Sequence, residues 1–161
     1  HMYRAFETLP KTSRVWIYQA DRVLSDQEVI SMAEQATAFC QQWAAHGASL
    51  ESSFQILHNR FLVLAVNEHV NLPSGCSIDA SVNFVRNMEQ HFDVNFLDRT
   101  KVAFVADNEV FVTPLSGLKT SVAEGIITPS TITFNNLVED IGEFEENWQT
   151  EAGNSWLKRY F

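Results

Sequence analysis

Apolar residues recur at helical spacing in one part of the N-terminal half and gather into short runs in others. Arg14–Ala20 is rich in β-branched and aromatic residues and predicts a strand. Ser25 and Glu28 have the spacing of a capping box, so we expect a helix to begin there. It should run to about His46, with Gly47 as its stop. Its apolar positions recur at steps of three and four residues and are Val29, Ala33, Ala36, Cys40 and Trp43.

A hairpin is expected next, built from strands at Ser53–Leu57 and Arg60–Val66. His58 and Asn59 lie between the strands, and Asn tolerates the left-handed conformation that tight hairpin turns require. The run Phe61–Val66 is apolar at every position. We therefore expect the second strand to be central, with both of its faces covered.

A second helix is predicted near Ile78–Phe92, where apolar residues again recur at helical spacing. Either Ser74 or Ser77 can cap it. The side chains expected on its buried side are Ile78, Val82, Val85, Met88 and Phe92.

A second hairpin, with strands at Lys101–Ala106 and Glu109–Val112, is expected to turn at Asp107 and Asn108. Asn135 and Asn136 follow a later strand and are interpreted as turn residues. The other predicted elements are a short helix at Leu115–Glu124 closed by Gly125, a strand at Thr131–Phe134, a capped helix from Asp140 to Trp148 and a helical turn in Asn154–Phe161.

The first two thirds of the chain thus have the order β-α-β-β-α-β, which is that of a ferredoxin-like sandwich. We predict an α+β fold in a single domain spanning residues 1–161, a usual length for one domain. A ferredoxin-like core would occupy about residues 5–108. A C-terminal α/β extension of hairpin, helix and strand, at about 109–161, would pack on it.

The chain is acidic, with 11 Lys and Arg against 20 Asp and Glu and a formal net charge of −9. Such a balance opposes nucleic-acid binding, which usually depends on a basic surface. No basic residue lies between Lys119 and Lys158, while acidic residues are frequent there. We interpret this stretch as a solvated face, and a patch for a basic partner is the alternative.

The longest apolar run, Phe61–Val66, is far shorter than the roughly 20 residues that a membrane helix needs. The segment Met2–Phe6 lacks the basic and then apolar pattern of a signal peptide. Two cysteines, Cys40 and Cys76, make no disulfide framework. We therefore expect a cytoplasmic protein without membrane insertion.

Cys76 is the one candidate nucleophile, because it lies where a loop enters the second predicted helix. Backbone amides and the helix dipole at such a position favour anions and can lower the pKa of a thiol. Catalysis at Cys76 is one hypothesis, with Gly75, Ser77, Asp79 and His69 as candidate ligand-binding residues. The alternative is that Cys76 fills space while its neighbours shape the helix cap.

No metal site is expected, and no cofactor. Glu68, His69, Cys76 and Asp79 form the only local group of potential ligands, and their spacing matches no established ligand pattern. The nearest approach to a phosphate-binding loop, Ser116–Ser121, lacks the first glycine and the Gly-Lys pair of a Walker A motif. ATPase activity is therefore not supported by the sequence.

Five strings resemble a family of small uncharacterised bacterial proteins often labelled "ABC transporter ATPase". The strings are RVWIYQADRVLSDQE, NRFLVLAVNE, SGCSIDASVNFV, ITPSTITFNNLV and NSW. The resemblance extends from about Phe6 to the end of the chain. Its label implies ATP hydrolysis, but the resemblance implies no catalytic residues for this chain.

The segment Glu109–Asn135 is also similar to small adaptor modules of the GYF type, which bind proline-rich peptides on aromatic surfaces. The similarity follows Pro114 and Leu115 through Gly125–Pro129 to Phe134, and the Gly-Tyr-Phe signature itself is absent. Hairpin, helix and strand packing alone is the other explanation of this pattern.

Three functions follow from these observations. The leading hypothesis is a non-catalytic binding or regulatory domain that uses an open sheet face or edge to bind a protein partner or a second copy of the chain. A small thiol-dependent enzyme using Cys76 is the second. A small-ligand-binding protein, with its ligand between sheet and helices, is the third.

Overall fold

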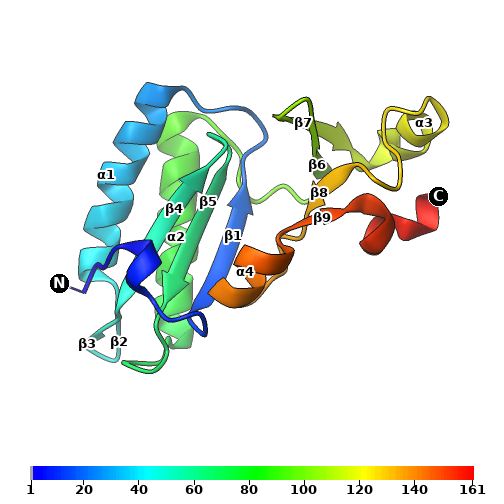
Figure 1. The fold of residues 1–161 in the computed structure, drawn as a ribbon. Helices are drawn as coiled ribbons and strands as arrows, with labels where there is room; N and C mark the ends of the chain where they lie inside the picture. The colour runs from blue at the N-terminus through cyan, green and yellow to red at the C-terminus, as the bar shows by residue number, and fades with distance from the viewer. Residues whose placement is uncertain (1) are drawn as a thin grey trace.

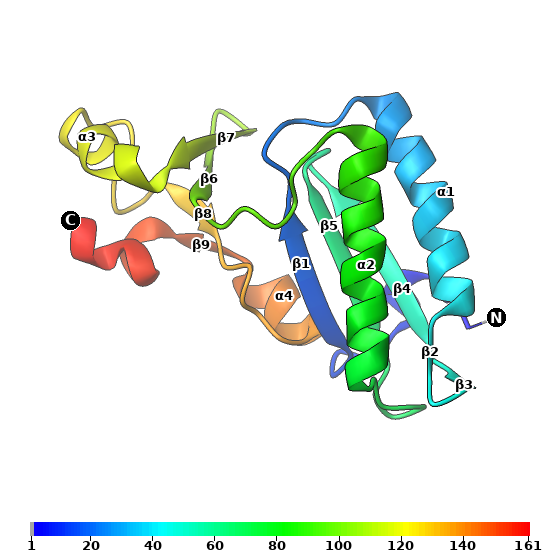
Figure 2. The same cartoon turned by 180° about the vertical axis from the view of Figure 1, so that it is seen from behind.

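The computed structural model describes residues 2–161 and has an α+β fold with three antiparallel sheets (Figure 1). The first sheet has the strand order β1-β5-β4, and helices α1 and α2 cover one of its faces (Figure 2). The elements of this part are β1 (Arg14–Gln19), α1 (Asp26–Gln42), β4 (Ser52–Leu57), β5 (Phe61–Val66) and α2 (Gly75–Phe92).

Helix α1 begins as the sequence predicts. The Ser25 side chain accepts a hydrogen bond from the Glu28 amide, and the Glu28 carboxylate accepts one from the Ser25 amide. Arg22 adds an ion pair to the same carboxylate at 2.8 Å. The two capping bonds satisfy backbone amides at the start of the helix, and the ion pair holds the Glu28 carboxylate in place.

The predicted end of α1 is wrong by about one turn. The helix stops at Gln42, and the chain forms a small hairpin of β2 (Ala44–Ala45) and β3 (Ala48–Ser49). His46 and Gly47 form its turn, with φ angles of 51° and 79°. Gly47 therefore serves the hairpin turn, which uses the same left-handed conformation as a helix stop.

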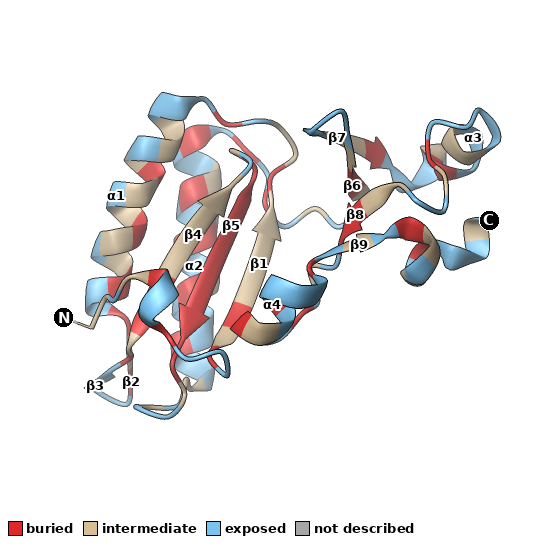
Figure 3. Cartoon of the chain, viewed as in Figure 1, coloured by how far each residue is buried: buried red, intermediate tan, exposed pale blue. Residues whose placement is uncertain are grey.

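Strand β5 is the central strand of the first sheet, and the prediction that both of its faces are covered is confirmed (Figure 3). It pairs with β1 on one side and with β4 on the other. Leu62, Leu64 and Val66 pack in the core beneath the helices. The turn that precedes the strand has positive φ at His58 and Asn59, as predicted.

The second face of this sheet is covered, so the expectation of an open sheet face is wrong. Phe61, Val63 and Ala65 pack there in a second core. The 3-10 helix η1 (Phe6–Thr8) and helix α4 (Ile141–Asn147) contribute to that core. The later part of the chain therefore takes the place that solvent or a partner was expected to fill.

Helix α2 begins at Gly75 with Ser74 as its N-cap, one of the two predicted caps. Its buried side differs from the prediction: Ile78 is 37% exposed, and Val82 is partly exposed. The small side chain of Ser77 lies inward instead, where the Trp43 indole donates a hydrogen bond to its carbonyl oxygen at 2.8 Å. The residues buried on this helix are Ser77, Ser81, Phe84, Val85, Met88 and Phe92.

The chain then leaves the first sheet. The predicted fourth strand, β6 (Lys101–Ala106), pairs with β7 (Glu109–Pro114) and β8 (Ile132–Phe134) in a separate sheet of order β7-β6-β8-β9. The β6–β7 hairpin turns at Asp107 and Asn108, as predicted, and it crosses the expected boundary near residue 108. The last strand, β9 (Gln149–Glu151), was not predicted.

A small third core stabilises this sheet. Phe104, Leu118 and Leu157 are buried in it. The predicted helix after β7 is present as η2 (Leu115–Gly117) and α3 (Leu118–Ala123). The chain ends in the short 3-10 helices η3 (Ala152–Asn154) and η4 (Trp156–Tyr160), so the predicted helical turn is confirmed. Within residues 2–161, none of the helices has both the length and the apolar character to cross a membrane.

Candidate functional site

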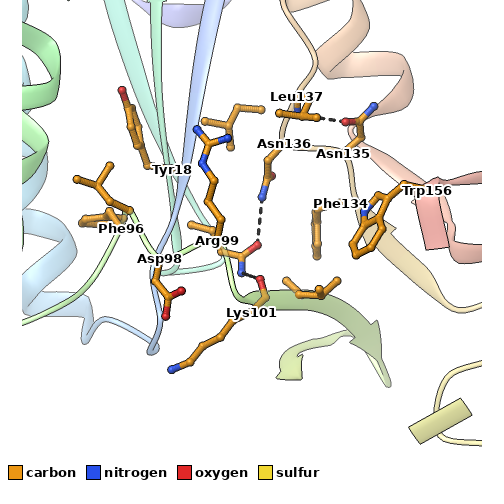
Figure 4. Close-up of a pocket in the computed structure, with 15 residues that line it drawn as sticks. Tyr18, Phe96, Asp98, Arg99, Lys101, Phe134, Asn135, Asn136, Leu137 and Trp156 are labelled. Carbon is orange, nitrogen blue, oxygen red and sulfur yellow. Dashed lines mark hydrogen bonds between the residues drawn. The ribbon is translucent and has the colours of Figure 1, made fainter. Parts of the chain in front are cut away.

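A pocket of about 200 Å³ lies between the open edge of β1 and the second sheet (Figure 4). We call it the inter-sheet pocket. It is lined by the end of β1, the α2–β6 connection with the start of β6, the end of β8 with the loop that follows, and Trp156. Its lining residues are Ile17, Tyr18, Gln19, Phe96, Leu97, Asp98, Arg99, Lys101, Val102, Ala103, Phe134, Asn135, Asn136, Leu137 and Trp156.

A chain of amide hydrogen bonds joins the two sheets beside the pocket. The Trp148 indole donates to Asn136 Oδ1 at 2.9 Å, and Asn136 Nδ2 donates to Gln19 Oε1 at 3.1 Å. Gln19 Nε2 then donates to the Lys101 carbonyl oxygen at 3.1 Å. Each amide both donates and accepts, so the chain fixes the orientation of both side chains.

The open edge of β1 exposes backbone groups to this pocket. Even-numbered residues of β1 bond to β5, so the amides of odd-numbered residues point away from it. Val15 uses its amide to bond to the Glu139 carbonyl oxygen at 2.9 Å. In the described part of the chain, the N–H and C=O groups of Ile17 and Gln19 have no hydrogen-bond partner.

This edge is hydrogen-bonded to neighbouring segments at both ends. Beyond the Val15–Glu139 bond, Asp21 donates its amide to the Asn95 carbonyl oxygen at 2.9 Å. Asn95 belongs to the connection from α2 to β6. Hydrogen bonds within that connection order it, since the Asn95 side chain accepts from the amides of Leu97 and Asp98. The unpaired backbone groups of Ile17 and Gln19 therefore lie between two hydrogen-bonded ends of the same edge.

The acidic side chain of the pocket has hydrogen-bond partners, whereas its two basic side chains are in no ion pair with the described residues. Asp98 accepts hydrogen bonds from Thr100, and these lower the pKa of its carboxyl group. Arg99 and Lys101 belong to neither of the two ion pairs found within residues 2–161. The Arg99 side chain extends between Tyr18 and Asn136, whereas the Lys101 ammonium points away from them (Figure 4). Burial raises the pKa of the Tyr18 hydroxyl.

Apolar side chains form the rim of the same pocket. Leu137 is 75% exposed and Trp156 is 52% exposed. Leu97 adds a third exposed apolar side chain from the α2–β6 connection. Isolated exposed apolar residues are ordinary, but three around one cavity that also has polar groups are typical of ligand sites.

The residues predicted from sequence lie elsewhere, around the start of α2. Cys76, Gly75 and Asp79 are exposed, and none of them lines the inter-sheet pocket. Ser77 is buried, and its hydroxyl accepts from the Ser74 amide in the helix cap at 2.6 Å.

His69 is exposed, and its Nε2 lies 3.0 Å from the Thr12 hydroxyl oxygen. Within residues 2–161 no three His, Cys, Asp or Glu side chains are grouped closely enough to hold a metal ion. The role of Cys76 as a nucleophile stays a prediction, and so do the ligand roles of its neighbours.

Comparison with known proteins gives no further guide. The chain matches no known family profile, no curated protein and no solved structure. Its resemblance to the family labelled "ABC transporter ATPase" therefore stays a prediction.

Sequence reasoning missed the inter-sheet pocket because its residues are far apart in the chain. Gln19, Arg99 and Asn136 come from three different segments. Asn136 was interpreted as a turn residue, yet its side chain bonds to Gln19 and Trp148. One signal was present in the sequence: the apolar Leu137 directly follows two amide side chains at the end of a predicted strand.

Proposed function

We propose that this protein is a non-catalytic binding domain and that the inter-sheet pocket is its ligand site. The observation that carries the proposal is the unpaired backbone edge at Ile17 and Gln19, held open inside a preformed pocket. Unpaired backbone groups bind solvent or a ligand, and a fold that needed neither would cover them.

The chemistry of the lining supports binding more than catalysis. The pocket lining has no Cys, His or Ser side chain, and its one carboxylate, Asp98, accepts two hydrogen bonds from Thr100 through Oδ1. A nucleophile with an adjacent base is the usual requirement for covalent catalysis. Hydrogen-bonding groups beside apolar side chains are the usual composition of a recognition site.

A titration followed by two-dimensional amide NMR tests this proposal. A library of small fragments and short peptides is added to the labelled protein, and ligands are expected to shift the amide signals of Ile17 and Gln19 and the indole signal of Trp156. Leu137→Asp should weaken these shifts, whereas Leu72→Asp should not, because Leu72 is 64% exposed but lies outside the pocket. Shifts confined to the start of α2, or no shifts, would contradict the proposal.

We also propose that the first sheet derives from a ferredoxin-like sandwich that lacks its fourth strand. The antiparallel order β1-β5-β4, with α1 and α2 on one face, supports this. In a complete sandwich the fourth strand pairs with β1, so the pocket lies where that strand would be. Pairing of any added segment with β4 instead of β1 would count against this derivation.

The location and the partner belong to the same proposal. Two free cysteines and an acidic composition support a cytoplasmic protein, and fractionation of the source cells tests this. A protein partner is favoured over a homodimer, because the open sheet face expected to pair two copies is covered. Sedimentation of the pure protein as a dimer would reverse that preference.

A further inference from the structure

We infer that the inter-sheet pocket binds the C-terminal tail of another polypeptide, paired as a short extra strand along β1, with the tail carboxylate at Arg99. The inference rests on the proposed function and specifies the class of ligand.

The first argument is the pattern of groups on the edge. Ile17 and Gln19 each present an N–H donor and a C=O acceptor toward the pocket. An extended peptide backbone has donors and acceptors at the matching repeat, about 6.6 Å for every two residues. Addition of a strand to an open edge is an established way of binding peptides, in which the backbone supplies the affinity.

The second argument is the length of the open edge. Val15 is already bonded to Glu139, and Asp21 is bonded to Asn95, so neighbouring chain segments close the edge at both ends. Only the stretch between these two bonds is free, which fits about three extended residues at about 3.3 Å each. A long internal segment would collide with those neighbours, whereas a chain terminus can enter the pocket and stop.

The third argument is charge, and it selects the carboxyl terminus over the amino terminus. Arg99 extends along the pocket and has no ion-pair partner within residues 2–161. The lining has two cationic side chains, Arg99 and Lys101, against one carboxylate, Asp98, whose Oδ1 already accepts two hydrogen bonds from Thr100. A guanidinium binds a carboxylate through two parallel hydrogen bonds, which a terminal carboxylate can accept.

The fourth argument concerns the side chains of the tail. Leu97, Leu137 and Trp156 are exposed at the rim of the pocket. Successive side chains of an added strand point in opposite directions, so every second residue of the tail faces one side. An apolar residue at one of the last three positions of the tail would cover this rim.

The test uses synthetic heptapeptides with free C-termini and randomised last three positions. Peptides retained by the protein are identified by mass spectrometry, and the best one is labelled with fluorescein at its N-terminus. Its Kd is measured by fluorescence anisotropy in three forms: the free acid, the C-terminal amide, and the acid with one N-methylated backbone amide among the last three residues.

The amide and the N-methyl peptide are each expected to bind about tenfold more weakly than the acid, the change expected for loss of one well-formed hydrogen bond. Arg99→Gln should weaken the acid about tenfold and leave the amide unchanged, because both changes remove the same contact. Arg86→Gln is the control, since Arg86 is exposed on α2 and lies outside the pocket. These peptide changes leave the protein unaltered, so misfolding cannot imitate their effect.

The outcomes separate this inference from the proposed function. Equal affinity for acid and amide, or full tolerance of N-methylation at all three positions, would overturn the inference. Binding of small fragments at Ile17 and Gln19 with no retained peptide would also overturn it, while the proposed function would stand. Failure of fragments and peptides alike would overturn both.

Discussion

The two cysteines have opposite surroundings, and this difference sets their reactivity. Cys40 is fully buried on α1, where burial raises the pKa of its thiol to about 12. Cys76 is exposed on the first turn of α2. Since the thiolate is the reactive form, a buried thiol with a raised pKa reacts slowly with alkylating reagents.

We predict that a thiol reagent labels one cysteine quickly in the folded protein and two in urea. The Cys76→Ser variant should lose the fast reaction and keep one thiol that is labelled only after unfolding. Absorbance with an aromatic disulfide reagent measures both numbers. Two fast thiols in the folded wild-type protein would show that Cys40 is accessible.

The capping carboxylate of α1 makes stability depend on pH. Hydrogen bonds from the Arg22 side chain and from the Ser25 amide lower the pKa of Glu28 to about 2. A carboxyl group with a depressed folded-state pKa stabilises the fold above its unfolded pKa of about 4.3, and the contribution is lost as the pH falls through the folded value.

Glu28→Gln should therefore lower the free energy of unfolding at pH 7, and the difference from wild type should shrink between about pH 4 and pH 2. Urea unfolding at a series of pH values measures it. Glu34→Gln, at an exposed position on the same helix, is the control and should change stability little at any pH. A stability difference between Glu28→Gln and wild type that stays constant down to pH 2 would contradict the lowered pKa of Glu28.

Among the elements, the loop after β8 joins the two sheets through one side chain. Asn136 accepts from Trp148 and donates to Gln19, so its removal leaves a donor and an acceptor without partners. Asn136→Leu is expected to lower the free energy of unfolding by about 1–3 kcal/mol, the cost of unpaired polar groups that are partly buried.

Chemical denaturation measures this loss, with Asn83→Leu on the exposed side of α2 as the control. The control should change stability by no more than about 0.5 kcal/mol, as is usual for surface positions. Equal effects of the two substitutions would show that the amide chain contributes nothing to the joint between the sheets.

Elements with strong local signals were predictable from sequence. The capping box of α1 and the two hairpin turns are contacts between near neighbours, so the residues that make them are visible in the sequence. The buried side of α2 was not, because its orientation depends on the Trp43 indole, which bonds to Ser77 from another element. β9 has the polar sequence QTE and forms through pairing with β8.

On the scale of the whole molecule, the two sheets share a core and should unfold together. The Phe61 ring lies 4.6 Å from Phe134 and 4.9 Å from Trp148, measured between ring centroids. Phe61 belongs to the first sheet, whereas the other two residues come from the later part of the chain. Loss of either part would expose this aromatic cluster, which makes separate unfolding costly.

We predict a single urea transition when native NMR signals from α1 and from α3 are followed in the same samples. Their midpoints should coincide, and Phe61→Leu should shift both by the same amount. An earlier midpoint for α3 would show that the second sheet unfolds independently.

The candidate site could not be predicted from the sequence, because it depends on how the two sheets are arranged in the whole molecule. Local patterns do not show which sheet β6 joins, and the pocket exists because β6 leaves the edge of β1 free. The unpaired backbone groups on which the proposal rests are main-chain atoms of Ile17 and Gln19, and every residue has such atoms. Sequence reasoning favoured Cys76 because a reactive side chain can be recognised without knowledge of the fold.

During synthesis, β5 is made long before some of the residues that cover it. Its apolar run Phe61–Val66 leaves the ribosome early, but one of its faces is covered only in part by earlier residues such as Phe6, and the rest of the cover, from Phe134 to Trp148, follows much later. At roughly 5–20 residues per second, that face waits for several seconds. A short apolar strand without charge or proline is the kind of segment that aggregates when exposed. The nascent chain is therefore expected to need a chaperone during that interval, although this face of β5 is buried in the folded protein.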